Sequence, residues 1–109
     1  MDDIDKISQE MGVSTKAYLR MCETFITTTD IDLDNLYEAI GRGDIEKIAF
    51  LAHHIKGAAL NLDLTDLSKI AKRVELNSKA GDIEGVSRDF ERLKNKFEEE
   101  KKRLLSKNG

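Results

Sequence analysis

Apolar residues recur at intervals of three and four along almost the whole chain, and no proline interrupts them. This interval matches the 3.6-residue turn of an α-helix, so the pattern predicts helices that each bury one face. Proline would break a helix interior, and its absence allows long helices. The predicted fold class is therefore all-α.

Glycine followed closely by a short polar residue separates the predicted helices. Gly12 precedes Ser14, and the pairs Gly43–Asp44 and Gly81–Asp82 repeat the arrangement. Glycine favours the left-handed conformation that ends a helix, and serine or aspartate caps the start of the next one. The helical pattern covers residues 4–11, 15–28, 33–40, 45–60, 67–74 and 83–104, with an expected break at the threonine-rich run 27–30 and Thr65 as a further cap.

The connections between these segments are short, and short connections make neighbouring helices antiparallel. We therefore expect an up-and-down antiparallel four-helix bundle with one or two shorter helices at its N-terminal end. A length of 109 residues suits one domain over residues 1–109 that buries its own core, and we expect a monomer.

Charge and composition argue against several kinds of function. The net charge is −3, whereas proteins that bind nucleic acids usually carry a cluster of basic residues and a positive charge. The single cysteine, Cys22, argues against an intrachain disulfide or a cysteine-rich zinc site, and its place on an apolar stripe predicts burial. The acidic start is unlike a signal peptide, and no apolar run reaches the ~18 residues of a membrane span. We expect a cytoplasmic protein that binds neither nucleic acid nor membrane.

The helix predicted at about residues 44–60 carries the chemically informative side chains. At about 100° per residue, its apolar face centres on Ala52, His53 lies at the edge of that face, and His54 lies on the solvent side. Imidazole is a good nucleophile near neutral pH. Helical geometry thus distinguishes two adjacent histidines and favours His53 as the reactive one.

The neighbours of His53 at helical spacing suit an anionic group on its ring. Lys56, at i+3, can place its ammonium near that group, and Gly57, at i+4, removes a side chain and clears the approach. Phe50, at i−3, is predicted to be exposed, and exposed apolar surface often marks docking. No carboxylate on this helix has the spacing of a catalytic base, and the chain has no glycine-rich phosphate loop and no evident metal site.

The segment Ala52-His53-His54-Ile55-Lys56-Gly57-Ala58 resembles the Ala-His-x-Leu-Lys-Gly-Ser motif of histidine-containing phosphotransfer domains. The resemblance extends to Ala39-Ile40, Gly43-Asp44, Asn61-Leu62 and Leu67, over about residues 33–77. It implies a four-helix bundle whose histidine accepts a phosphoryl group from a receiver aspartate or a histidine kinase and passes it to a response-regulator receiver domain. The receiver would bring the Mg²⁺, so the chain itself needs no cofactor.

Mapped by this motif, His53 is the phosphoacceptor, Lys56 stabilises the phosphoryl charge, and Gly57 lies beneath the site. The resemblance implies a phosphocarrier without ATP-dependent kinase activity. We expect Phe50 and His54 to contact the docking partner. The sequence departs from the family pattern in three places. Asp63 replaces a glycine, and we expect it to cap a helix instead. Ala58 replaces a frequent serine, and His54 replaces threonine or serine.

Two other functions fit the same sequence. The motif is shared with the N-terminal phosphoacceptor domain of chemotaxis-type histidine kinases, from which this chain could be excised. The initial methionine and the polar tail at residues 106–109 favour a free-standing protein. The second alternative is a helical adaptor whose histidine is never phosphorylated.

Overall fold

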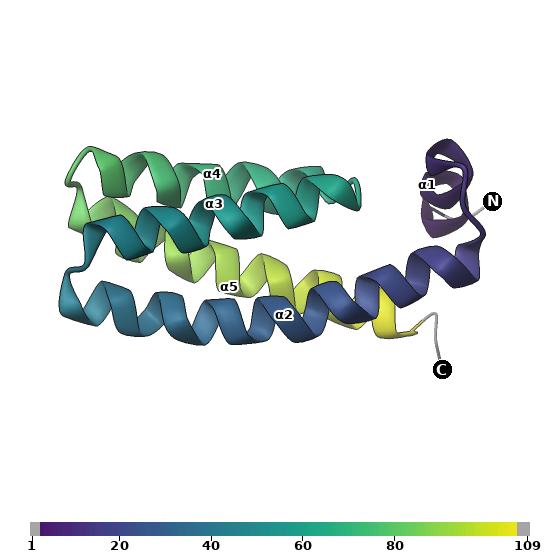
Figure 1. The fold of residues 1–109 in the computed structure, drawn as a ribbon, viewed down its shortest axis with the longest axis horizontal. Helices are drawn as coiled ribbons and strands as arrows, with labels where there is room; N and C mark the ends of the chain where they lie inside the picture. Colours follow the sequence, from purple (N-terminus) through teal and green to yellow (C-terminus); the bar gives the residue numbers. More distant parts are fainter. Residues whose placement is uncertain (1–2, 107–109) are drawn as a thin grey trace.

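The computed structural model describes residues 3–106, and within that range it contains five α-helices and no strand (Figure 1). They are α1 (Asp3–Met11), α2 (Thr15–Arg42), α3 (Ile45–Asn61), α4 (Thr65–Lys79) and α5 (Ile83–Ser106). Successive helices from α2 to α5 run in opposite directions, and each contacts the next, with α5 returning to α2. The predicted fold class is confirmed, with one short helix, α1, across the end of the bundle. Residues 107–109 of the polar tail lie outside the described residues.

Most of the predicted helix ends are correct. The hydroxyl of Ser14 accepts a hydrogen bond from the Ala17 amide at 3.0 Å and caps α2, which ends at Gly43 with φ of 67°. Asp44 caps α3 in the same way through the Lys47 amide. These contacts satisfy backbone groups that a helix end otherwise leaves unpaired.

The turn between α3 and α4 differs from the sequence prediction. Helix α4 starts at Thr65 without a side-chain cap, so Thr65 does not have the predicted role. Asp63 does not cap a helix either; its backbone adopts φ of 58°, a conformation that glycine prefers. Aspartate is one of the few other residues that tolerate it. This explains how the turn forms without the family's usual glycine.

The predicted break within residues 27–30 is wrong, because α2 is one continuous helix of 28 residues that includes them. The hydroxyls of Thr24 and Thr27 donate to the carbonyls of Arg20 and Glu23, one turn earlier in the same helix. Thr29, in the same run, is buried in the bundle. Tertiary packing of α2 therefore outweighs the weak helix propensity of threonine.

The core runs along the bundle axis and receives the apolar stripe of every helix, including the buried Cys22. On α3 the buried residues are Ile48, Leu51, Ala52, Ile55 and Ala59. Ile45, predicted on this face, is 39% exposed at the first turn. No helix within residues 3–106 combines the length and low charge that a membrane span needs.

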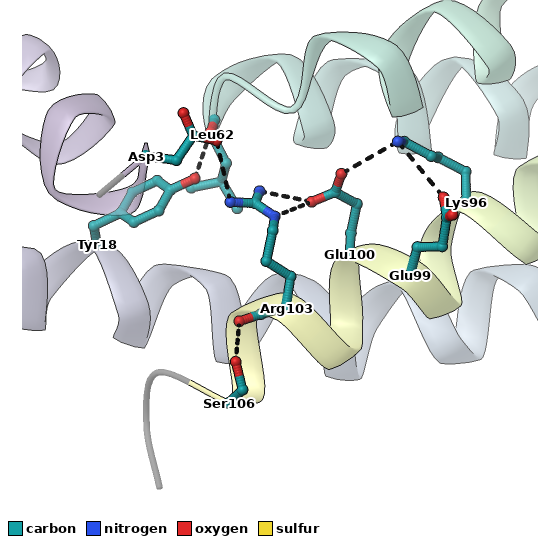
Figure 2. A network of polar contacts seen from close by, with 8 residues as sticks. All are labelled: Asp3, Tyr18, Leu62, Lys96, Glu99, Glu100, Arg103 and Ser106. Atoms are coloured by element: carbon teal, nitrogen blue, oxygen red, sulfur yellow. Dashed lines mark hydrogen bonds and ion pairs between the residues drawn. The ribbon is translucent and has the colours of Figure 1, made fainter. Parts of the chain in front are cut away.

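Polar contacts tie the α3–α4 turn and α1 to the long helices (Figure 2). The buried Tyr18 hydroxyl of α2 donates to the Leu62 carbonyl at 2.8 Å. Burial raises the pKa of Tyr18 far above its ordinary value, so this hydroxyl remains a donor. On α5, Arg103 pairs with Glu100 at 2.7 Å and with Asp3 of α1 at 3.5 Å. The Tyr18 hydrogen bond fixes the α3–α4 turn to α2, and the Arg103–Asp3 pair joins α1 to α5.

Candidate functional site

Helix α3 places His53 at the edge of its buried stripe. The flanking residues Ala52 and Ile55 are fully buried, whereas the His53 side chain is 64% exposed. Its ring reaches across to α4, because α3 and α4 pack side by side as an antiparallel pair. The predicted boundary position of His53 is confirmed by this arrangement.

The His53 ring contacts a carboxylate that lies 22 residues further along the chain. His53 Nδ1 lies 3.0 Å from Oε2 of Glu75, on the facing side of α4. The Glu75 side chain is only 8% exposed, although its partner ring is mostly in solvent. The imidazole is therefore held at one nitrogen by a fixed, largely buried acceptor.

Two lysines contact the same carboxylate. Lys56 Nζ donates to Oε1 of Glu75 at 3.1 Å, and Lys79 Nζ lies 3.2 Å from Oε2. Burial alone would raise the pKa of the Glu75 carboxyl, but the hydrogen bonds and charges of these lysines outweigh it and hold that pKa below its ordinary value. Glu75 is therefore ionised at neutral pH.

The charge state of Glu75 determines the arrangement of protons on His53. An ionised carboxylate only accepts hydrogen bonds, so Nδ1 of His53 must carry the proton that lies between them. In the neutral ring, the lone pair then belongs to Nε2, the nitrogen that Glu75 does not contact. The site thus presents a nucleophilic nitrogen on an exposed ring.

His54 also has a carboxylate partner, on the opposite side of α3. Its Nδ1 lies 2.8 Å from Oδ2 of Asp32 on α2, and its side chain is 51% exposed. The predicted position of His54 on the solvent side is confirmed by this exposure, whereas its contact with α2 was not predicted. Exposure does not separate the two histidines. The difference lies in the lysines, since no lysine is paired with Asp32 within the described residues.

The surface beside His53 is open. A side-chain carbon added at Gly57 would meet no other residue within 4 Å, so this glycine relieves no crowding in the described chain. Phe50, one turn before His53, is 68% exposed, as its helical position predicted. Phe50, His53, Glu75 and Lys79 line one shallow groove between α3 and α4.

The model of the Hpt domain family matches residues 20–102, which include the whole of α3 and α4. The chain belongs to the Hpt domain family. No curated protein and no solved structure matched it. Hpt domains are phosphocarrier modules built as helical bundles, so the match indicates a role in phosphotransfer within two-component signalling.

Glu75 was not among the predicted site residues, because it lies on a different helix from His53. A signal was present in α4, where Ala71, Glu75 and Ser78 share the i, i+4, i+7 spacing of one buried face. An acidic residue on such a stripe needs a partner, since an unpaired buried charge is costly. Asp32 carried a similar signal on α2, because Thr29 and Leu36, at i−3 and i+4, are buried and its own side chain is 14% exposed. Lys79 is exposed and carried no such signal.

The described residues of the Hpt domain hold no cluster of three or more histidine, cysteine or acidic side chains suited to a metal ion. What the site brings together is an imidazole, one carboxylate and two ammonium groups. These groups can orient a nucleophile and balance the charge of a transferred anion.

Proposed function

We propose that this Hpt domain carries a phosphoryl group on Nε2 of His53 as an intermediate in a phosphorelay. It would accept the group from a receiver aspartate or a histidine kinase and donate it to the receiver domain of a response regulator. The observation that carries the proposal is the contact between His53 Nδ1 and Glu75, which leaves Nε2 as the free nucleophile. Mg²⁺ would come from the receiver, and the domain would have no ATP-dependent kinase activity of its own.

In the accepting step, the Nε2 lone pair attacks the phosphorus atom of the receiver's phosphoaspartate. The N–P bond forms, the P–O bond breaks, and its electron pair returns to the aspartate carboxylate. The ring keeps its Nδ1 proton and becomes positively charged. The ionised Glu75 lies 3.0 Å from that proton's nitrogen and offsets the charge.

The donating step reverses these movements. An aspartate of the second receiver attacks the phosphorus atom, the N–P bond breaks, and its electron pair returns to Nε2. A positively charged ring is a better leaving group than a neutral one, because it departs as neutral imidazole. Glu75 therefore supports both directions of transfer, and the net direction depends on which receiver is phosphorylated.

The receiver would dock over Phe50 and Gly57. Phe50 offers exposed aromatic surface, and the open space at Gly57 allows a second backbone to approach the ring. His54, held by Asp32, lines a shallow groove between α2 and α3 whose other walls include Met21 and Leu62. We assign His54 to the docking surface on this basis.

The test uses the purified chain, a phosphorylated receiver domain with Mg²⁺, and a radioactive phosphoryl label. We expect the label to move to this Hpt domain as an acid-labile, base-stable phosphate. His53→Gln should abolish this transfer, whereas His54→Gln, the matched control on the adjacent residue, should retain it.

Two results would contradict the proposal. One is the absence of any base-stable phosphate on the wild-type chain after incubation with several phosphorylated receivers and a kinase–receiver pair. The other is a His53→Gln variant that still accepts the label while His54→Gln does not. The first result would instead support a structural adaptor whose histidine is idle.

A further inference from the structure

The carboxylate of Glu75 has more cationic partners than it needs. Lys56 occupies Oε1, while His53 and Lys79 share Oε2 at 3.0 and 3.2 Å. One negative charge therefore faces two ammonium groups beside the phosphoacceptor. Glu46, the other acidic residue that lines this groove, forms no ion pair among residues 3–106.

The two lysines differ in their freedom to move. The Lys56 side chain is 24% exposed, and it is the only partner of Glu75 Oε1 in the described part of the chain. Lys79 is 61% exposed and is the last residue of α4. If Lys79 leaves Oε2, Glu75 keeps both Lys56 and His53 as partners, so the departure costs little.

A phosphoryl group on His53 would add about −1.5 to −2 charges to this surface. Lys79 lines the same groove as His53, and its side chain is exposed and long enough to turn from Glu75 towards an anion on Nε2. We propose that Lys79 binds the phosphoryl group on His53, exchanging Glu75 for the new anion, while Lys56 remains paired with Glu75. This inference rests on the proposed function. It gives the two lysines different roles, whereas the motif identifies only Lys56.

The test phosphorylates the chain with phosphoramidate, a small donor that needs no receiver. The His53 Nε2 lone pair attacks the phosphorus atom, the N–P bond to His53 forms, and the P–N bond of the donor breaks as ammonia leaves. The ³¹P NMR signal of the product is then followed through a pH titration, which reports the last ionisation of the phosphoryl group.

We expect Lys79→Met to raise the pKa of this phosphoryl group by about half a pH unit, a threefold change in the ionisation constant, because a neighbouring ammonium favours the dianion. Lys79→Arg should restore the wild-type titration. Lys69→Met, which removes an exposed lysine of α4 that has no contact with Glu75, should not change it. Lys56→Met should have the smaller effect of the two site lysines.

A Lys79→Met titration that matches wild type, or an effect confined to Lys56→Met, would overturn the inference and leave the proposed function intact. Failure of phosphoramidate to label His53 would also overturn it. A wild-type chain that is labelled by phosphoramidate but exchanges no phosphoryl group with any receiver would overturn the proposed relay function instead. With a working receiver, Lys79→Met should shift the transfer equilibrium about threefold towards the receiver.

Discussion

Replacing Glu75 by glutamine separates the two effects that this carboxylate has on His53. Glutamine has nearly the same shape, and its carbonyl oxygen can still accept the hydrogen bond from Nδ1. The substitution removes the negative charge and replaces the oxygen that accepts from Lys56 by an NH2 group, while the acceptor for His53 stays in place. The phosphorylated ring, which carries a positive charge, then loses its electrostatic partner.

The expected magnitude follows from the geometry. His53 Nδ1 and Glu75 Oε2 are 3.0 Å apart, and unit charges at that distance attract by about 1.4 kcal/mol in the dielectric of water. The ring is 64% exposed, so solvent screening and side-chain freedom reduce the value to between about 0.5 and 1.4 kcal/mol. The equilibrium for phosphoryl transfer onto His53 should therefore fall about two- to tenfold in Glu75→Gln.

The assay measures that equilibrium from both sides, starting with labelled receiver or labelled Hpt domain, and quantifies the label on each protein. Long-range ¹H–¹⁵N NMR correlations read the protonated nitrogen of His53 in the same samples. Glu75→Ala serves as the comparison, because it removes the acceptor as well as the charge. We expect Nδ1 to stay protonated in the wild type and in Glu75→Gln, and the neutral ring of Glu75→Ala to populate both tautomers.

A Glu75→Gln variant whose transfer equilibrium stays within twofold of wild type would refute this role of Glu75, as would a Glu75→Ala variant that retains a single Nδ1–H tautomer. Thermal unfolding of each variant must show an intact bundle, so that a loss of transfer is not a loss of fold.

Three further predictions use other features of the site. Gly57→Ala should raise the free energy of unfolding by about 0.5–1 kcal/mol, because alanine favours a helix and meets no neighbour here. The same substitution should slow phosphoryl transfer from a receiver. Labelling by phosphoramidate should stay unchanged. Equal slowing with both donors would show that Gly57 affects His53 itself. Phe50→Ser should weaken receiver binding by about 1–2 kcal/mol in calorimetry, with the free energy of unfolding changed by less than about 0.5 kcal/mol. Tyr37→Ser is the control, because Tyr37 has the same 68% exposure but lies near α5. Equal losses of binding affinity in the two variants would exclude a specific role for Phe50. Because the pKa of Glu75 lies below its ordinary value of 4.5 in the folded chain, the stability from its ionisation is present above that pH and disappears as the pH falls through the lowered pKa. The difference in unfolding free energy between wild type and Glu75→Gln should therefore shrink between about pH 6 and about pH 3, and a difference that is constant over this range would contradict the lowered pKa.

The helical architecture was predictable because it depends on local sequence. The spacing of apolar residues defines the buried face of each helix, and the caps at Ser14, Asp44 and Gly43 act on backbone groups within a few residues. The continuous α2 is the exception. Its threonine-rich segment has weak helix propensity, and the bundle that packs against Thr29 decides its conformation.

The candidate site divides in the same way. The sequence by itself determined that His53, Lys56 and Gly57 share one side of a helix, because i+3 and i+4 spacing is set by the helical turn. Only the tertiary structure decided which side chains complete the site. Glu75 and Lys79 reach His53 through the packing of α4 on α3, and Asp32 reaches His54 through the length of α2. Contacts between helices depend on how two surfaces interlock, and the periodicity of one helix holds no information about its neighbour's register.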